Sequence, residues 1–452
     1  MRFLSRATVM LLGLLLAFGA GELLVRQQIP ADEDGQRWLG QTRLLPWRFP
    51  MQQIHDRLAA LDRGETLFLI DPDLGWRPRP GARSRDGKVS IDATGMRDNA
   101  TPTMPPQDTA AAFRIVTIGD SFTFGDEVSD AETWPAQLER ILRSEGVPAR
   151  VFNLGTNAYG IDQAVLRLVR DGTPLRPDVV ILGLQPENLM RNVNILRPIF
   201  FPDTALPLSK PRFVLDDGDL HLRNHPTLEP DEILKFLEDP ESHPLAPDEA
   251  WLDERYEEAY WQQSALLSLL AQRLAATGVH RSDSGPGSSP RASAIDRREA
   301  EMLQLGTALL AKFAAEAQAI GARPLLVYLP RRAELEAQLA GTELWYGQWL
   351  EQVTTDRAND QPRSALPELP ILPVLPVLPD HAGGTRHVIV RPEAGMTVVT
   401  EELFAPAGHY SARQNLRVAE SLALALQPSL RNFRAAARAD DAGPVATPVA
   451  RQ

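Results

Sequence analysis

The sequence predicts an α/β domain with a central parallel sheet that is covered by helices on both faces. Three short apolar runs, Ile115–Ile118, Pro177–Leu184 and Pro324–Pro330, have the length and content of buried strands. Helical patterns at 133–144 and 161–169 stand between strands. Alternation of strand and helix indicates a parallel sheet, because each parallel strand needs a long crossover connection.

Length and composition are those of a globular protein, and they exclude several classes. The chain has 452 residues, which indicates an enlarged core with insertions. Its formal net charge is -12 and no run rich in Lys and Arg stands out, so we expect no nucleic-acid partner. Without cysteine the chain forms no disulfide and no thiolate metal site. The histidines are scattered and no phosphate-cradling glycine loop is present, so we expect neither a metal nor another cofactor.

Residues 1–26 have the composition of a membrane-targeting segment. Arg2 and Arg6 precede the uncharged run 7–21, and apolar residues resume after Glu22. The run has the length of a signal-peptide core, but the apolar residues beyond Glu22 favour an uncleaved anchor. With the basic end in the cytoplasm, we expect the rest of the chain in a bacterial-type periplasm or outside, or secreted if the segment is cleaved.

Residues 27–110 are expected to form a stalk and a short strand pair. Apolar residues at helical spacing between Met51 and Leu61 predict a stalk helix, with a solvated linker as the alternative. Segments 71–81 and 89–98 have the pattern of two short strands with turns. A Pro- and Thr-rich link then leads into the main domain.

The stretch 114–127 places Ser121 directly beyond the first strand of that domain. Gly119 ends the apolar run in a sharp turn. Ligands bind at this edge of open α/β sheets, because helix N-termini leave backbone N–H groups unpaired there. A serine in such a place can be a nucleophile. Gly119, Asp120 and Ser121 can also be plain turn formers, so the residues alone leave both interpretations open.

Further motifs follow in an order that resembles the SGNH, or GDSL, hydrolase family. Gly119-Asp-Ser-Phe resembles the first block of the family, and Arg150-Val-Phe-Asn-Leu-Gly155 the second. The third ends a strand at Asn188, and the last is Gly408-His-Tyr-Ser411 before an amphipathic helix. The resemblance covers about 112–196 and 322–427 in pieces. It implies a flavodoxin-like three-layer sandwich around the parallel sheet.

The resemblance implies that Ser121 is a nucleophile and His409 its general base. A serine hydroxyl is a poor nucleophile unless a base within hydrogen-bond reach takes its proton. Ser411 and Gln414 have the spacing of a capping box, so His409 is expected on a loop just ahead of the helix 412–427.

The resemblance also implies an oxyanion hole. Its donors would be the backbone N–H groups of Ser121 and Gly155 and the side-chain amide of Asn188. Gly155 suits this role because a residue without a Cβ lets a substrate oxygen approach its N–H. Asn192 and Asn194 are alternatives to Asn188.

The chain departs from the family pattern at the acid of the triad. Pro406 stands where the family usually has an aspartate, three residues before the histidine. The nearest acids in sequence, Glu402, Glu401 and Asp380, are candidates, and a backbone carbonyl can also orient an imidazole. Asp120 is interpreted as a structural residue of the turn.

Within the main domain, which we expect to span 111–430, an insertion at 197–295 is predicted to shape the substrate cleft. It should contain a hairpin around 213–222 and a helix near 255–276. Its aromatic residues could stack on a sugar or belong to the core: Phe200, Phe201, Trp251 and Trp261.

The last part of the chain carries three further signals. Asp296 and Glu299 have the spacing of a capping box that starts a helix. Proline at every third position of 367–379 predicts a polyproline II segment, more simply a stiff surface segment than a ligand for a proline-binding module. The tail 431–452 is expected to be disordered.

Together these patterns predict an exported, membrane-anchored serine hydrolase that cleaves small acyl esters through an acyl-enzyme. The resemblance implies acetyl esters of carbohydrate as the first expected substrate and lipid esters as the second. One alternative is an O-acyltransferase that modifies an envelope or extracellular polysaccharide. Another is a non-catalytic envelope protein that keeps the fold. The sequence leaves the oligomeric state open.

Overall fold

The computed structural model describes residues 2–102, 112–252, 256, 260–276, 290–340, 388–389 and 401–441. The chain divides into two compact units. The first comprises Met1–Arg63, Val193–Lys210 and Arg223–Glu301, and the second Gly64–Asn192, Pro211–Leu222 and Met302–Gln452. The predicted polyproline segment at 367–379 lies outside the described residues.

A five-stranded parallel sheet forms the centre of the second unit. Its order is β11-β10-β7-β5-β6. The strands are β5 (Phe113–Gly119), β6 (Ala149–Asn153), β7 (Val179–Leu184), β10 (Arg323–Tyr328) and β11 (Val388–Ile389). The chain passes from β5 to β6 on one side and then to β7 on the other side of β5. The direction of winding therefore reverses at β5, and such a switch point is where open α/β sheets bind ligands.

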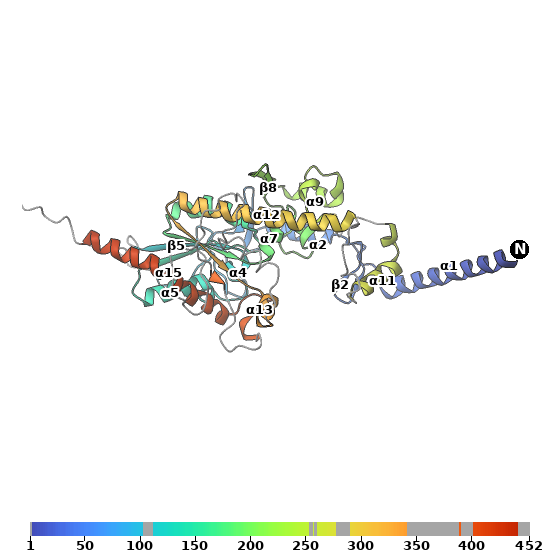
Figure 1. Ribbon diagram of the computed structural model, residues 1–452, viewed down its shortest axis with the longest axis horizontal. Helices are drawn as coiled ribbons and strands as arrows, with labels where there is room; N and C mark the ends of the chain where they lie inside the picture. Colours follow the sequence, from blue (N-terminus) through green and yellow to red (C-terminus); the bar gives the residue numbers. More distant parts are fainter. Residues whose placement is uncertain are drawn as a thin grey trace, which may run out of the picture. The chain divides into compact units, whose positions relative to one another are not determined.

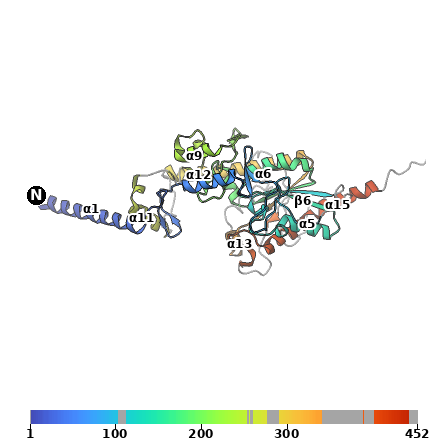
Figure 2. The same cartoon turned by 180° about the vertical axis from the view of Figure 1, so that it is seen from behind.

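Helices cover both faces of this sheet (Figures 1 and 2). On one face α5 (Trp134–Ser144) and α15 (Ala412–Asp441) pack against alternate strand residues such as Ile115 and Ile181. On the other lie α6 (Ile161–Arg167) and the part of α12 (Pro290–Ala319) beyond Glu301. The predicted fold class, a central parallel sheet between two helical layers, is confirmed.

The sequence explains why α5 forms and where it packs. Thr133 accepts a hydrogen bond from the Ala136 N–H at 3.3 Å and so caps the first turn, while Pro135 occupies a position where a missing N–H costs little. Trp134 and Leu138 are then buried against the sheet. Burying one such leucine stabilises the fold by roughly 1.5–3 kcal/mol.

Two helix boundaries differ from the prediction. Helix α12 begins at Pro290, so the capping spacing at Asp296 lies inside it. Helix α15 continues past the buried Leu430 to Asp441, so the first part of the predicted tail is helical, and 442–452 lie outside the described residues. In both cases the extra segment is rich in Ala and Arg, which favour helix, and the helix extends through it.

The second unit is completed by short elements. The hairpin β3 (Phe68–Asp71) and β4 (Gly75–Pro78) precedes the sheet, and the predicted hairpin is β8 (Arg212–Asp216) and β9 (Asp219–Arg223). Segment 89–98 makes isolated bridges, such as Ile91 with Arg97, in place of the predicted strand. The remaining elements are α4 (Ser121–Phe124), η1 (Asp130–Glu132), η2 (Leu168–Gly172), η3 (Thr173–Leu175), α7 (Glu187–Asn192), α13 (Arg332–Leu339) and η7 (Glu401–Leu403).

The first unit contains the N-terminal helix and most of the predicted insertion. Helix α1 (Arg2–Gln28) includes Thr8–Gln28, which is long and apolar enough to cross a membrane, with a mean hydropathy of 2.1. The predicted stalk helix is α2 (Met51–Asp62), and it buries Ile54, Leu58 and Leu61. The other elements are β1 (Trp38–Leu39), β2 (Thr42–Arg43), α8 (Arg197–Phe200), α9 (Pro230–Glu238), η4 (Pro240–Ser242), η5 (Ala246–Asp248), η6 (Tyr260–Gln263) and α11 (Ala265–Ala276).

Candidate active site

Ser121 is the first residue of α4, immediately beyond the carboxyl end of β5. The turn that presents it requires glycine at 119, where φ is 146° and an added Cβ would lie 2.4 Å from Thr123 Oγ1 and 2.6 Å from the Gly183 carbonyl oxygen. Asp120 caps α4 by accepting a hydrogen bond from the Phe122 N–H at 3.0 Å. Strand, turn and cap therefore fix the serine at the switch point of the sheet.

The other oxygen of Asp120 holds this edge of the sheet together. Asp120 is fully buried, and its Oδ2 accepts hydrogen bonds from Gln185 at 2.7 Å, Asn188 at 3.1 Å and Arg191 at 2.9 Å. A buried carboxylate needs such partners to offset the loss of water. The contacts agree with the predicted structural role of Asp120.

His409 lies on a tight loop between η7 and α15. Ala405 N–H donates to the His409 carbonyl at 2.8 Å, and Gly408 takes a left-handed conformation with φ of 98°. The neighbouring Tyr410 is buried, and its hydroxyl donates to the Pro330 carbonyl at 2.8 Å. This anchored loop limits the conformational freedom that the imidazole would lose on reacting.

Ser121, His409 and Glu127 form a connected chain of side chains. His409 Nε2 lies 2.9 Å from Ser121 Oγ, and Nδ1 lies 2.9 Å from Glu127 Oε2. Because a carboxylate accepts hydrogen bonds, Nδ1 carries the proton and Nε2 is left to accept the serine hydroxyl. Hydroxyl, imidazole and carboxylate thus stand in the order of a serine hydrolase triad.

Glu127 is held in place by three hydrogen bonds from residues 404–411, which we call the histidine loop. Besides the imidazole, the N–H groups of Ala407 and His409 donate to its carboxylate, at 2.7 and 3.1 Å. Partial burial alone would raise the pKa of Glu127, but these three bonds outweigh it, and the pKa lies below its usual value of 4.5. Glu127 is therefore ionised at neutral pH. Its backbone has φ of 69°, which turns the chain toward the loop.

A second carboxylate, that of Asp126, stands on the other side of the imidazole. Its Oδ2 lies 3.8 Å from His409 Nε2 and accepts a hydrogen bond from the Asn157 side chain. Burial raises the pKa of Asp126, and the nearby imidazole and the Asn157 amide oppose this without cancelling it. Asp126 thus borders the space where Nε2 meets its reaction partner.

None of the acids proposed from the sequence is shown next to His409. Glu402 is exposed and pairs with Arg413, while the Glu402 carbonyl accepts the Ser411 hydroxyl at 2.5 Å. Glu401 begins η7, and its side chain lies outside the described part of the structure. Asp380 lies outside the described residues. The acid that contacts the imidazole comes instead from six residues beyond the serine.

The sequence contains a signal for Glu127, but it is a weak one. Gly125-Asp-Glu127 directly follows the short helix that starts at the serine, so two carboxylates are bound to lie near Ser121. The left-handed backbone that directs Glu127 toward the histidine loop cannot be read from the sequence, because glutamate seldom adopts it.

Two of the three expected oxyanion donors, Gly155 and Asn188, have hydrogen-bond acceptors within the protein. Gly155 N–H donates to Asn153 Oδ1 at 3.0 Å, and the Asn188 amide donates to Asp120 and to the Tyr159 carbonyl. Both donors are thus already engaged. A Cβ at Gly155 would lie 2.3 Å from the Phe124 nitrogen, so the glycine is required by packing against α4.

The backbone N–H of Ser121 differs from these two donors. Among the hydrogen bonds of the described residues it has no protein acceptor. It remains at the start of α4, where the partial positive charge of backbone N–H groups favours an anion. Of the alternatives, Asn194 donates to Glu249 at 2.9 Å. Asn192 accepts from the Ile161 N–H at 2.8 Å through its oxygen, and its buried Nδ2 has no hydrogen-bond partner among the described residues.

The aromatic residues expected to bind sugar belong to the first unit. Trp251 is buried, with its ring 5.1 Å from that of Phe200 and with the Arg298 guanidinium 4.4 Å above it. Trp251 is thus a core residue. Phe201 and Trp261 are exposed, and a role in sugar binding stays a prediction for them.

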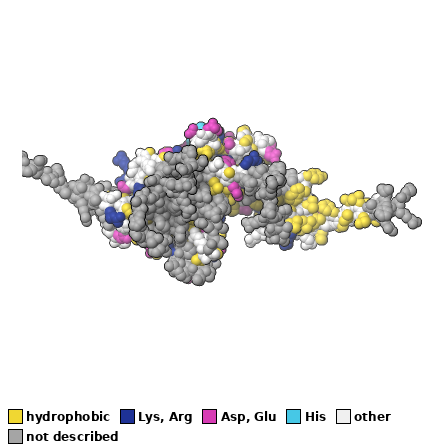
Figure 3. All heavy atoms as spheres, viewed as in Figure 1, with side chains coloured by type: hydrophobic (Ala, Val, Ile, Leu, Met, Phe, Trp, Pro, Cys, Tyr) yellow, Lys and Arg dark blue, Asp and Glu magenta, His cyan; other side chains and the backbone are white. Residues whose placement is uncertain are grey.

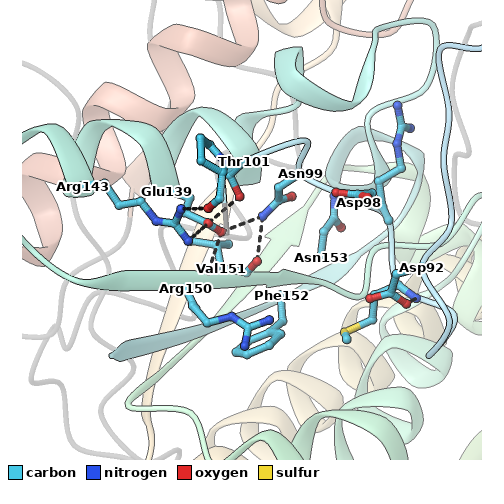
Figure 4. A pocket seen from close by; sticks show the side chains of 13 residues that line it. Asp92, Asp98, Asn99, Thr101, Glu139, Arg143, Arg150, Val151, Phe152 and Asn153 are labelled. Carbon is cyan, nitrogen blue, oxygen red and sulfur yellow. Dashed lines mark hydrogen bonds and ion pairs between the residues drawn. The ribbon is translucent and has the colours of Figure 1, made fainter. Parts of the chain in front are cut away.

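A polar cavity of about 390 Å³ lies elsewhere in the second unit (Figure 4). Its carboxylate, Glu139, faces Arg143 and accepts hydrogen bonds from Asn99, Thr101 and the Val151 N–H, at 2.7 to 2.9 Å. These partners within the protein already satisfy the Glu139 carboxylate. The cavity does not include Ser121 or His409 among its lining residues, so it is not part of the triad site.

Comparison with known proteins gives weak likenesses. No family model and no curated protein matches the chain. The crystal structure of TesA shares 13% identity, covering 70% of this chain and 98% of that chain at a TM-score of 0.30. A lipolytic protein of the G-D-S-L family from Desulfitobacterium hafniense DCB-2 shares 12% identity, covering 70% of this chain and 99% of that chain at 0.27. Scores this low carry no argument about this chain, so the functional interpretation depends on the geometry of its site.

Proposed function

We propose that the chain is a serine hydrolase of the SGNH type that cleaves small acyl esters through an acyl-enzyme. The observation that carries the proposal is the continuous contact from Ser121 Oγ through His409 to Glu127, with both links at 2.9 Å. Triads of this kind are identified by geometry and roles, since they occur in several chain orders, with Asp or Glu as the acid.

In the first half-reaction Ser121 attacks the ester carbonyl. Its Oγ forms a bond to the carbonyl carbon while His409 Nε2 takes the hydroxyl proton. Glu127 stabilises the imidazolium that results, and its three donors keep it ionised for that task. The imidazolium then gives its proton to the leaving alcohol oxygen, and the acyl group stays on Ser121. The Ser121 N–H, which has no protein acceptor among the described residues, is the donor that we expect to bind the oxyanion.

In the second half-reaction a water or a hydroxyl replaces the alcohol. It must give its proton to the same Nε2, so it has to lie next to that nitrogen. Asp126 Oδ2, at 3.8 Å from Nε2, is placed to accept a hydrogen bond from this second nucleophile and to orient it. Asn157 holds Asp126 in that position. Water gives hydrolysis, and a sugar hydroxyl gives acyl transfer.

We expect the site to accept a small acyl group. Two observations support this expectation: Ser121 is only 6% exposed, and the Phe122 ring lies 5.1 Å from the imidazole ring. The family resemblance makes acetyl esters of carbohydrate the first substrate class. The assembled acid, base and nucleophile also weaken the alternative of a non-catalytic protein, which was based on a missing acid.

The experiment that tests this proposal is hydrolysis of a chromogenic acetyl ester by the purified full chain. We expect turnover that falls at least about 10³-fold in Ser121→Ala, because the nucleophile is lost. Ser144→Ala, at an exposed position on α5, is the control and should keep full activity. Equal activity in Ser121→Ala and the parent chain would disprove the role of Ser121. Labelled acetyl groups recovered on a glycan and not as acetate would assign the transferase alternative.

A further inference from the structure

The acidic residue inside the apolar N-terminal helix has a defined partner. Glu22 of α1 accepts hydrogen bonds from Ser264 Oγ at 2.7 Å, Ala265 N–H at 3.0 Å and Leu266 N–H at 2.9 Å. These donors stand at the first turn of α11, whose N–H groups have no partner within the helix. Glu22 therefore caps α11, and its negative charge complements the positive end of the helix dipole.

Two further contacts tie α11 and the preceding η6 to the end of α1. Arg26 pairs with Glu22 at 2.6 Å and donates to the Gln263 carbonyl at 2.8 Å. At Gly21 an added Cβ would lie 3.0 Å from a methyl carbon of Leu266, so the two helices approach closely at a residue without a side chain. Small residues at such crossings are typical of helices that pack within membranes.

Helix α11 is apolar, yet its leucines are not buried. Its sequence Ala-Leu-Leu-Ser-Leu-Leu-Ala-Gln-Arg-Leu-Ala-Ala contains five leucines, and none is among the buried residues of the described chain. Leu270 is 49% and Leu274 52% exposed, while Tyr260 and Trp261 in the adjoining η6 are 88% and 37% exposed. Exposed apolar surface of this kind marks an interaction site. Hydrophobic side chains also cover the visible surface of α1 (Figure 3).

We propose that α11 and η6 lie in the interfacial layer of the same lipid bilayer that α1 crosses. Continuity with the apolar segment Thr8–Gln28 supports this occupant, because Glu22 and Arg26 join α11 to the end of that segment. With 12 residues α11 is too short to span a bilayer, which takes about 20 residues. Tyrosine and tryptophan favour the interface, and Arg26 and Arg273 suit anionic headgroups.

The same contacts have a consequence for processing. Cleavage after the uncharged run would remove Glu22 or leave it at a free chain end, and α11 would lose its cap. We therefore expect α1 to be retained as part of the first unit and not removed as a signal peptide. This inference rests on the insertion of α1 into a membrane and is independent of the proposed esterase activity.

The test uses the natural absence of cysteine in the full chain. Leu270→Cys on α11 carries an environment-sensitive fluorophore in vesicles of phosphatidylcholine and phosphatidylglycerol. Lys235→Cys, at an exposed position on α9 of the same unit, is the control. We expect lipid-attached nitroxide to quench the label at 270 several-fold more than the label at 235, and aqueous iodide to do the reverse. Equal responses of the two labels to iodide would overturn the proposal.

Three additional readouts test the lipid occupant, the capping role of Glu22 and the retention of α1. Self-quenching between labels at 270, without quenching by lipid nitroxide, would mean that a second copy covers α11, and it would overturn the lipid occupant. In the double variant Glu22→Gln, Leu270→Cys the label should become more accessible to iodide, whereas no change would contradict the capping role.

The intact mass of the full chain purified from membranes should include residues 1–28, and a chain shortened near Gly21 would contradict retention of α1.

Discussion

At the scale of single residues, Glu127 completes the candidate triad from an unexpected position. It lies six residues beyond the serine, and the histidine that it contacts lies 282 residues further along the chain. Two backbone N–H groups of the histidine loop bind the same carboxylate. Glu127 therefore both orients the imidazole and fixes the loop that carries it.

Replacing Glu127 with Gln should reduce kcat for an acetyl ester by about 10⁴-fold, the size of effect known for amide replacement of a triad acid. The amide cannot stabilise the imidazolium and can favour the wrong tautomer. Glu402→Gln is the matched control, because Glu402 is exposed and pairs with Arg413. Steady-state kinetics of both variants provide the measurement. An equal loss of activity in the two variants would refute the assignment of the acid.

Glu127 should also make stability depend on pH. Since its pKa is lower in the folded chain than in the unfolded chain, its contribution is present above the usual value of 4.5 and is lost as pH falls through the lowered pKa. The difference in Tm between the parent chain and Glu127→Gln should therefore be largest near neutral pH and shrink below pH 4.5. A difference that stays constant from pH 7 to pH 3 would contradict this expectation.

Asp126 is the residue expected to affect the second half-reaction. In Asp126→Asn an amide NH2 replaces one carboxylate oxygen and cannot accept a hydrogen bond from the second nucleophile, which should slow deacylation by about tenfold. Acylation should change less, so the acyl-enzyme should accumulate at steady state. Intact-mass analysis of quenched reactions measures the acylated fraction. If that fraction and the rate of product formation both equal those of the parent chain, Asp126 has no such role.

At the scale of elements, the turn that joins β5 to α4 depends on close packing of backbone. Gly155→Ala should destabilise the chain by roughly 1–3 kcal/mol, because the Cβ would meet the Phe124 nitrogen at 2.3 Å and backbone must shift. Gly146 is the comparison, since a Cβ there meets no atom within 4 Å and only its φ of 76° opposes alanine. Denaturant unfolding of both variants tests this. A smaller loss in Gly155→Ala than in Gly146→Ala would contradict the packing argument.

The sequence predicted elements well where local pattern and tertiary structure agree. The strands at Ile115, Val179 and Leu325 are continuous apolar runs that only a doubly covered sheet can bury. The ends of helices were predicted less accurately, because residues that favour helix extend α12 and α15 beyond the ends that the sequence patterns indicate. Segment 89–98 has strand composition but makes only isolated bridges, since pairing depends on neighbours that sequence does not show.

At the scale of the whole molecule, the site combines segments that the sequence separates widely. Ser121 and His409 could be predicted as a pair because each stands in a short motif at a strand or helix boundary. The engagement of Gly155 and Asn188 could not, because it depends on Asn153 and Asp120 as competing acceptors. The acid could not be predicted from the family pattern, because Pro406 stands at its usual position. Glu127 provides the carboxylate, and its left-handed backbone brings it to the imidazole.

The most direct measurement is the site and rate of labelling by a fluorophosphonate, followed by peptide mass spectrometry. A nucleophilic serine activated by its neighbours reacts with this probe, whereas an ordinary serine does not. The geometry predicts a single covalent adduct on Ser121, with labelling that is lost in His409→Ala and strongly slowed in Glu127→Gln. Absence of an adduct on Ser121 in the folded parent chain would contradict the account.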